Sequence, residues 1–170
     1  MSRWKKVVFL RLIEELRVRF RDGILKKHEN KPLRVVQISD SHLIATTEGC
    51  LLGLNTEESL TLVLAKVAQE QPTIDVILAT GDIAQDASEV AYTRFQQHLA
   101  QFNAPSYWLQ GNHDITQPIL NTLNNKSHLS PCVIKQGGWH IIMLNSSVEH
   151  EVPGQFAPSE LVFLQQALQN

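Results

Sequence analysis

The sequence predicts an α/β domain built in layers, with neighbouring strands largely parallel. Short apolar runs alternate with longer segments in which apolar residues repeat at helical spacing. The apolar runs are continuous rather than alternating, as expected of strands covered on both faces. The chain has 170 residues, of which 43% are hydrophobic and 19% are charged. One globular domain of this size can bury a substantial core.

Each element is predicted from its own pattern. The strands are short apolar runs, several of them ending in polar clusters: residues 33–38, 74–79, 106–109 and 139–144. A polar loop with two glycines follows the first strand. The helices have apolar residues three or four positions apart: from Thr56 to the residue before Pro72, from about Ser88 to Phe102, 116–124, and a last helix that Ser159 caps. In the second helix we expect Val90, Phe95 and Leu99 to face inward.

The N-terminal segment differs from the rest of the chain in charge. Residues 1–34 hold eleven of the fifteen Lys and Arg and only four acids, whereas residues 35–170 hold four bases and thirteen acids. We therefore expect a basic extension over residues 1–32 and one domain over residues 33–170. Apolar spacing in the extension predicts an amphipathic helix that ends near Gly23. Either this segment lies on an anionic membrane surface, or it packs on its own domain or forms a partly ordered leader.

Composition excludes several classes of protein. No window of eighteen uncharged apolar residues is present, so no segment is expected to span a membrane. The apolar run over residues 7–10 is too short for a signal peptide, and no small-residue cleavage site follows it. Cys50 and Cys132 match no metal pair or disulfide framework and fit a reducing compartment, so we expect a cytoplasmic protein. No recognition motif accompanies the basic segment, and we expect no nucleic-acid partner. The sequence carries no signal for an oligomeric state.

Three polar clusters stand where predicted strands end: residues 40–42, 81–86 and 111–114. The carboxyl ends of parallel strands share one edge of a sheet, so these clusters should converge. Their carboxylates, imidazole and amide suit Mn²⁺, Fe or Zn²⁺ better than soft Cu(I). Each cluster alone has an ordinary alternative, such as a turn or a helix cap. All three at strand ends, in this order, favour a metal site.

The residue types predict a site for two metal ions. Asp40 and His42 lie two residues apart, so on an extended segment both would point to one side and bind one ion. Asp82 has two oxygens and can bridge both ions, and Asn112 can give a carbonyl oxygen to the second. Two ions roughly 3.5–4 Å apart bind phosphoryl oxygens and generate a hydroxide that attacks phosphorus in line.

Other residues of the clusters are expected to support this chemistry. His113 is a candidate acid or electrostatic clamp at the leaving group, and Asn112 and His113 are candidate substrate contacts. Asp114 is expected to orient His113 from behind. Gly81 and Gly111 each precede a ligand and allow the tight turn that directs it into the crevice.

These clusters resemble the opening motifs of the calcineurin-like metallophosphoesterases. The matching motifs are Asp40-x-His42, Gly81-Asp82 and Gly111-Asn112-His113-Asp114. A closer similarity, to bacterial class III cyclic AMP phosphodiesterases, covers residues 33–170 and rests on four segments: 37–43, 51–56, 79–86 and 108–114.

The resemblance implies a four-layer α/β/β/α sandwich, present here as its N-terminal portion. It also implies two metal ions, usually Fe and Mn, and a cyclic nucleotide substrate, 3',5'-cyclic AMP, that is hydrolysed to 5'-AMP. Carried over by position, Asp40 and His42 bind the first metal, Asp82 bridges, and Asn112 binds the second. His113 assists at the phosphate and leaving group.

The resemblance is incomplete on the C-terminal side. The family completes its site with a histidine after the next strand and with a later Gly-His-x-His pair, and this chain stops at Asn170 before either. None of the local histidines has the required context: His28, His98, His128, His140 and His150. We therefore expect the second metal site to be weakened most, and the chain to be weakly active or inactive. An open sheet edge would also make it prone to aggregate.

Two other functions stay open. The first is that of a non-catalytic remnant or binding module that holds one ion or a partner. The second is that of a phosphoesterase for another phosphate ester, although the 51–56 and 85–86 segments favour cyclic nucleotides. Two tightly bound ions would favour the enzyme, whereas one or none would favour the remnant.

Overall fold

A four-stranded sheet is the centre of the computed structural model, which describes residues 11–12, 32–148 and 151–169. The strands lie in the order β1-β2-β5-β6: Arg11–Leu12, Val35–Ile38, Val76–Thr80 and Ser106–Leu109. β2, β5 and β6 are parallel neighbours, and β1 pairs with β2 in the antiparallel direction. The predicted α/β class with parallel strands is confirmed.

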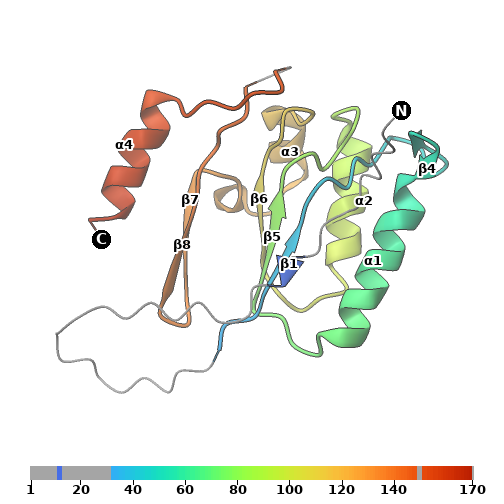
Figure 1. Cartoon of the computed structure of the whole chain (residues 1–170), viewed down its shortest axis with the longest axis horizontal. Coiled ribbons are helices and arrows are strands. Elements are labelled where there is room, and N and C mark those ends of the chain that lie inside the picture. The colour runs from blue at the N-terminus through green and yellow to red at the C-terminus, as the bar shows by residue number, and fades with distance from the viewer. Residues whose placement is uncertain (1–10, 13–31, 149–150, 170) are drawn as a thin grey trace, which may run out of the picture.

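Two helices cover one face of this sheet (Figure 1). α1 (Thr56–Glu70) connects β2 to β5, and α2 (Glu89–Leu99) connects β5 to β6. Each begins at a side-chain cap, because Asn55 Oδ1 accepts from Glu58 N at 2.8 Å and Ser88 Oγ accepts from Ala91 N at 3.3 Å. α1 therefore begins at Thr56, as predicted.

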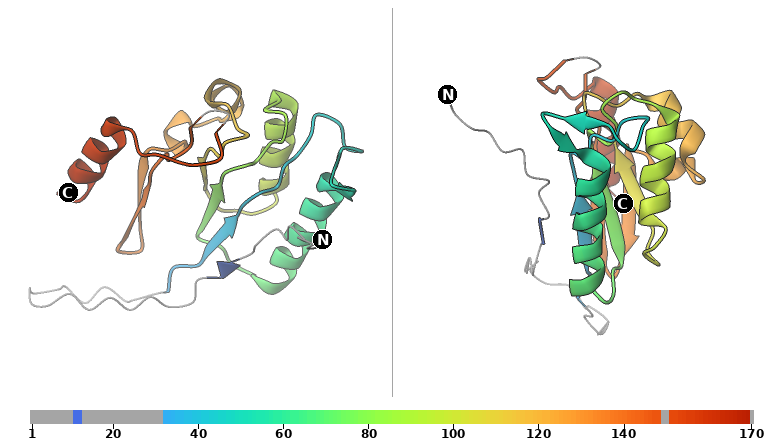
Figure 2. Two further views of the ribbon diagram at one scale, coloured as in Figure 1. Left: turned by 45° about the horizontal axis from the view of Figure 1, so that its top comes forward. Right: turned by 90° about the vertical axis from the view of Figure 1, so that its right-hand side faces the viewer.

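A β-hairpin covers the opposite face. Its strands, β7 (Cys132–Gln136) and β8 (Trp139–Met143), pair in the antiparallel direction. β5 contributes to both cores: Ile77 and Ala79 pack in the cluster that includes the helices, whereas Val76 packs with Cys132 and Met143 of the hairpin. Helices, sheet and second sheet thus follow one another in the order expected of the sandwich, and α4 (Pro158–Ala167) lies beyond the hairpin (Figure 2).

Some details differ from the sequence predictions. Val90 is 55% exposed, because the inward stripe of α2 is offset by one residue and consists of Ala91, Tyr92, Phe95 and Leu99. α4 begins at Pro158 with Ala157 at the cap, so Ser159 lies inside the helix. Four short elements and one strand were not predicted: β1, β3 (Cys50–Leu51), β4 (Leu54–Asn55), a 3₁₀ helix (Lys126–His128) and β7. α3 (Thr116–Thr122) lies within the predicted 116–124 helix.

Of the first 31 residues of the basic extension, two are described. Arg11 and Leu12 pair with Gln37 and Val36 as a strand, where a helix was expected, because the outer edge of β2 offers backbone partners to an extended segment. The rest of the predicted helix, which was expected to end near Gly23, lies outside the described residues. None of the helices in the described part of the chain combines the length and hydrophobicity that crossing a membrane requires.

The packing of α1 generates a matched pair of predictions. Leu64 is 1% exposed and Leu62, on the same helix, is 64% exposed. Leu64→Ala should lower the free energy of unfolding by about 2–5 kcal/mol, because it leaves a cavity in the core. Leu62→Ala should change it by less than about 0.5 kcal/mol. Urea denaturation followed by circular dichroism measures both, and equal losses would contradict the assigned face of α1.

Candidate metal centre

The polar clusters lie at the carboxyl ends of β2, β5 and β6. The loops after β2 and β5 stay paired beyond the strands: Asp40 N donates to Gly81 O at 3.1 Å and His42 N to Asp82 O at 2.9 Å. This continued pairing places the first two clusters side by side. Strand β6, next to β5, brings the third cluster to the same edge.

His42 is at the centre of the convergence. It is 3% exposed, and neither ring nitrogen has a hydrogen-bond partner. Its Nε2 lies 3.8 Å from Asp40 Oδ1 and 3.6 Å from Asp82 Oδ2, beyond hydrogen-bond distance. A buried polar group without a partner is costly, and an imidazole facing two carboxylates suits a divalent transition metal. The residues present therefore fit a metal ion.

His113 joins the same group. One ligand atom each from His42, Asp82 and His113 lie within 4.8 Å of one another. The two imidazoles meet edge to face with centroids 5.2 Å apart, and His113 N donates to Asp82 Oδ1 at 3.1 Å. The structure thus places His113, expected to act at the leaving group, directly beside the candidate ligands.

A small depression adjoins this group. Its volume is about 340 Å³, within the roughly 300–1,000 Å³ of small-molecule sites. Asn112 and His113 line it, together with Gln85, Asp86, Ala87 and Ile115. The two predicted substrate contacts therefore share one concave surface.

The backbone of three predicted ligands is in the left-handed region. The φ angles of Asp40, His42 and Asp82 are 57°, 45° and 48°. The Asp40–His42 segment is therefore not extended, and the predicted reason for the proximity of its side chains is wrong. Two left-handed residues bring them together instead, held by Ser41 Oγ, which donates to Ile83 O at 2.9 Å. Such conformations are uncommon outside glycine and concentrate at functional sites.

Two glycines permit the close approach of the loops. Gly81 has a φ of +90°, which confirms the predicted tight turn. At Gly111 the requirement is space: a Cβ atom there would lie 2.2 Å from Asp82 Oδ1. A side chain at residue 111 would thus displace the carboxylate that is expected to bridge two ions.

Asp114 binds the loops rather than His113. It is 2% exposed, and its carboxylate accepts four hydrogen bonds of 2.8–3.1 Å, from Ile83 N, Ala84 N, Gly111 N and Tyr92 Oη. The position behind His113 belongs to Gln85, whose Nε2 lies 3.1 Å from His113 Nδ1. The expected role of Asp114 is corrected accordingly, because four donors already converge on its oxygens.

Sequence reasoning missed Tyr92 and the orienting role of Gln85. Tyr92 could have been found from its place on the inward stripe of α2, next to the clusters in space. The other described histidines lie outside the site. His128 Nδ1 is 2.9 Å from Ser106 O, His98 contacts Glu57, and His140 is exposed on β8. His28 and His150 are outside the described residues.

Comparison with known proteins decides the family. The profile of the calcineurin-like phosphoesterases matches residues 33–157. The chain belongs to the calcineurin-like phosphoesterase family. This match confirms the family resemblance seen in the three polar clusters, residues 40–42, 81–86 and 111–114, which all lie within it.

Individual relatives within this calcineurin-like family are cyclic nucleotide phosphodiesterases by name. The chain is 40% identical over 149 residues to the 3',5'-cyclic adenosine monophosphate phosphodiesterase CpdA of Pseudomonas aeruginosa, covering 85% of this chain and 54% of the relative. It is 39% identical over 138 residues to CpdA of Escherichia coli K12, covering 80% and 50%. A 3',5'-cyclic-nucleotide phosphodiesterase of Nostoc is 33% identical over 141 residues, covering 83% and 53%. The chain spans about half the length of these curated relatives.

The contact between Tyr92 and Asp114 predicts a pH dependence. Burial, and then the negative charge of Asp114, raise the pKa of Tyr92 well above its ordinary value near 10. The folded state therefore keeps a proton that the unfolded state loses above pH 10, and stability falls as pH rises from there. Relative to Tyr92→Phe, the wild type should lose up to about 1.4 kcal/mol per pH unit above pH 10.

At pH 7, Tyr92→Phe itself should lower the free energy of unfolding by about 1–2 kcal/mol, because Asp114 loses a donor and Ile115 N loses an acceptor. Chemical denaturation at pH 7, 10 and 11 measures both effects. Tyr107→Phe is the matched control and should keep the pH response of the wild type. If the free energies of unfolding of the wild type and of Tyr92→Phe change equally with pH, the raised pKa of Tyr92 is refuted.

Proposed function

We propose that this chain carries the first ligand segments of a metal-dependent phosphodiesterase that hydrolyses 3',5'-cyclic AMP to 5'-AMP. The observation that carries the proposal is the buried imidazole of His42, which has no hydrogen-bond partner and faces the carboxylates of Asp40 and Asp82. Membership of a phosphoesterase family supports the reaction type. The substrate is proposed from the names of relatives at 40% and 39% identity.

The ligands are proposed residue by residue. Asp40 and His42 would hold one ion, Asp82 would hold both, and Asn112 would hold the second. Fe and Mn are the expected ions, and the donor set also suits Zn. When bound, the two ions supply a hydroxide at neutral pH and offset negative charge on the phosphoryl oxygens.

The residues of the depression would bind and orient the substrate. Asn112 and His113 line it, so both are placed to contact the phosphate. The contact between Gln85 and His113 Nδ1 fixes one ring nitrogen and leaves Nε2 to donate to the phosphate or the leaving oxygen. The volume of about 340 Å³ lies in the range of small-molecule sites, as a cyclic nucleotide substrate requires.

We propose that the catalytic activity of this 170-residue chain is impaired. Among the described residues, His42, Asp82 and His113 form one group of His, Cys, Asp or Glu side chains that could hold a metal ion. A binding module that holds a single ion is therefore one alternative. Hydrolysis of another phosphate ester is the other alternative. The free cysteines Cys50 and Cys132 support a cytoplasmic location, and the charge of residues 1–32 is the basis for a proposed contact with an anionic membrane surface.

The metal site is tested by a pair of histidine variants. His42→Ala should weaken Mn²⁺ binding by about 100-fold or more. Mutation of a residue that only hydrogen-bonds to a metal ligand already lowers metal affinity about 10–100-fold. His140→Ala, at an exposed histidine of β8, should bind Mn²⁺ as the wild type does. Electron paramagnetic resonance of free Mn²⁺ measures the affinity, and circular dichroism verifies folding. Equal affinities of the wild type and His42→Ala would remove the basis of the proposal.

The proposed impairment is tested by activity. Purified chain with excess Mn²⁺ should convert 3',5'-cyclic AMP to 5'-AMP slowly or not at all, because the second ion has few ligands. Chromatographic detection of 5'-AMP gives the rate, and bis(p-nitrophenyl) phosphate tests for another ester. Turnover above about 1 s⁻¹, which is ordinary for an enzyme, would show that the described ligands suffice.

A further inference from the structure

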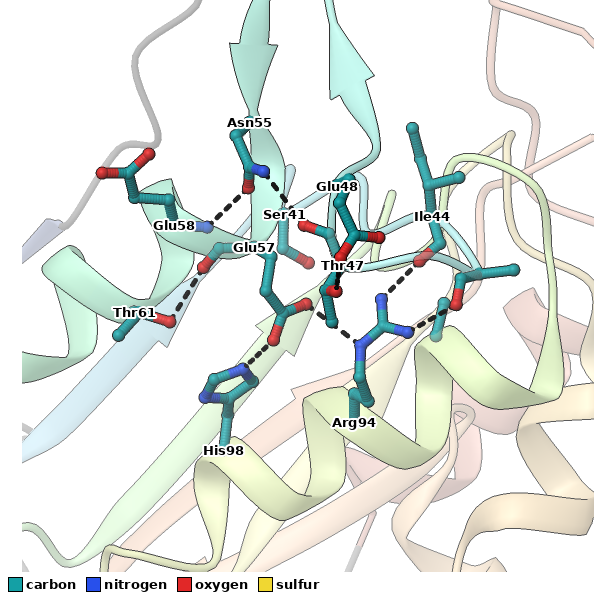
Figure 3. A network of polar contacts seen from close by, with 12 residues as sticks. Ser41, Ile44, Thr47, Glu48, Asn55, Glu57, Glu58, Thr61, Arg94 and His98 are labelled. Atoms are coloured by element: carbon teal, nitrogen blue, oxygen red, sulfur yellow. Dashed lines mark hydrogen bonds and ion pairs between the residues drawn. The ribbon is translucent and has the colours of Figure 1, made fainter.

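A partly buried ion cluster connects α1, α2 and the loop that follows His42 (Figure 3). It consists of Glu57 in α1 and of Arg94 and His98 in α2, with side chains 18%, 17% and 22% exposed. Arg94 Nε donates to Glu57 Oε2 at 3.1 Å, and His98 Nε2 lies 2.5 Å from Glu57 Oε1. Glu57 therefore binds two α2 residues that are one turn apart.

Arg94 also binds the backbone of the loop. Its two terminal nitrogens donate to the carbonyl oxygens of Ile44 and Ala45, the latter at 2.7 Å. A guanidinium presents several N–H donors in one rigid plane, which a lysine ammonium does not. Glu57 accepts from the remaining nitrogen, Nε, and so orients the guanidinium. The guanidinium in turn holds the carbonyl groups of two consecutive residues, Ile44 and Ala45, in place.

Asp86 holds the same loop from the other side. Ala45 N donates to Asp86 Oδ2 at 2.9 Å. Partial burial works to raise the pKa of Asp86, but hydrogen bonds from Ala45 and Ser88 outweigh it and hold the pKa below its ordinary value. The carboxylate is therefore charged near neutral pH, and Ala45 is held at both its amide and its carbonyl.

The loop matters because it begins at His42. The imidazole has no hydrogen-bond partner of its own, and its residue has a φ of 45°. Its direction depends on the backbone on either side. Before it lies the pairing of Asp40 N with Gly81 O, and after it Leu43 is buried and paired with Ile83. Arg94 binds the first residues beyond this pairing.

We propose that Arg94, oriented by Glu57, is a positioning residue that keeps the His42 imidazole directed at Asp40 and Asp82. This inference rests on the metal site proposed above. Arg94 would act through the carbonyls of Ile44 and Ala45 and would touch neither metal nor substrate. A cluster that only stabilised the fold would change the free energy of unfolding and leave the metal affinity of folded protein unchanged.

The test is the Mn²⁺ affinity of folded Arg94 variants. Arg94→Met keeps the apolar stem and removes all donors, so we expect the dissociation constant for Mn²⁺ to rise about 10-fold or more. Arg94→Lys keeps the positive charge near Glu57 but loses the planar set of donors. Its dissociation constant for Mn²⁺ should therefore rise by an intermediate factor. Lys66→Met is the control, because it removes the cation of an exposed ion pair with Glu70 on α1; its affinity should match the wild type. Titration is done well below each unfolding midpoint.

The outcomes separate the two proposals. An Arg94→Met variant that is folded and binds Mn²⁺ within twofold of the wild type would overturn the positioning role alone. A wild type that does not bind Mn²⁺ would overturn the metal site itself. If Arg94→Met does not fold, Arg94→Lys and Glu57→Gln decide, and wild-type affinity in both would count against the inference.

Discussion

The buried carboxylate of Asp114 is the interaction on which the site depends. Its two oxygens bind backbone N–H groups from the loops after β5 and β6 and the hydroxyl of Tyr92 on α2. Each such bond contributes about 1 kcal/mol net, but a buried donor that loses its acceptor costs about 1–3 kcal/mol. Asp114 therefore connects the loops that carry Asp82 and His113 to each other and to helix α2.

The second constraint is backbone strain at the residues proposed as metal ligands. A left-handed conformation costs an L-residue about 1–2 kcal/mol, and Asp40, His42 and Asp82 all adopt it. Several kcal/mol is a large part of the stability of a domain of this size. Loop pairing across the ends of β2 and β5 offsets the strain, and Gly111 leaves room for Asp82. The side chains proposed as metal ligands are thus held in place by the fold itself.

Much of this arrangement could be predicted from the sequence because it follows from periodicity and order. Apolar runs gave the strands β2, β5 and β6, and parallel strands bring their carboxyl ends to one edge. The sequence predictions that were wrong concern features that depend on tertiary contacts. The exposure of Val90 reflects a one-residue offset in α2. The role of Asp114 depends on donors from two distant segments, residues 83–84 and Tyr92, in addition to the nearby Gly111. The left-handed residues carry no glycine to signal them, and strand β7 was missed because its sequence between Pro131 and Gly137 is short and mixed.

The two thiols of the chain occupy opposite environments. Cys132 is 8% exposed between the sheet and the hairpin, and burial raises its pKa, whereas Cys50 is exposed on β3. An alkylating reagent will therefore modify Cys50 in the native protein and reach Cys132 only when β7 and β8 separate from β5. Alkylation of Cys132 therefore reports separation of the hairpin from the sheet, and alkylation of Cys50 in the same chain serves as the reference reaction. No engineered label is needed.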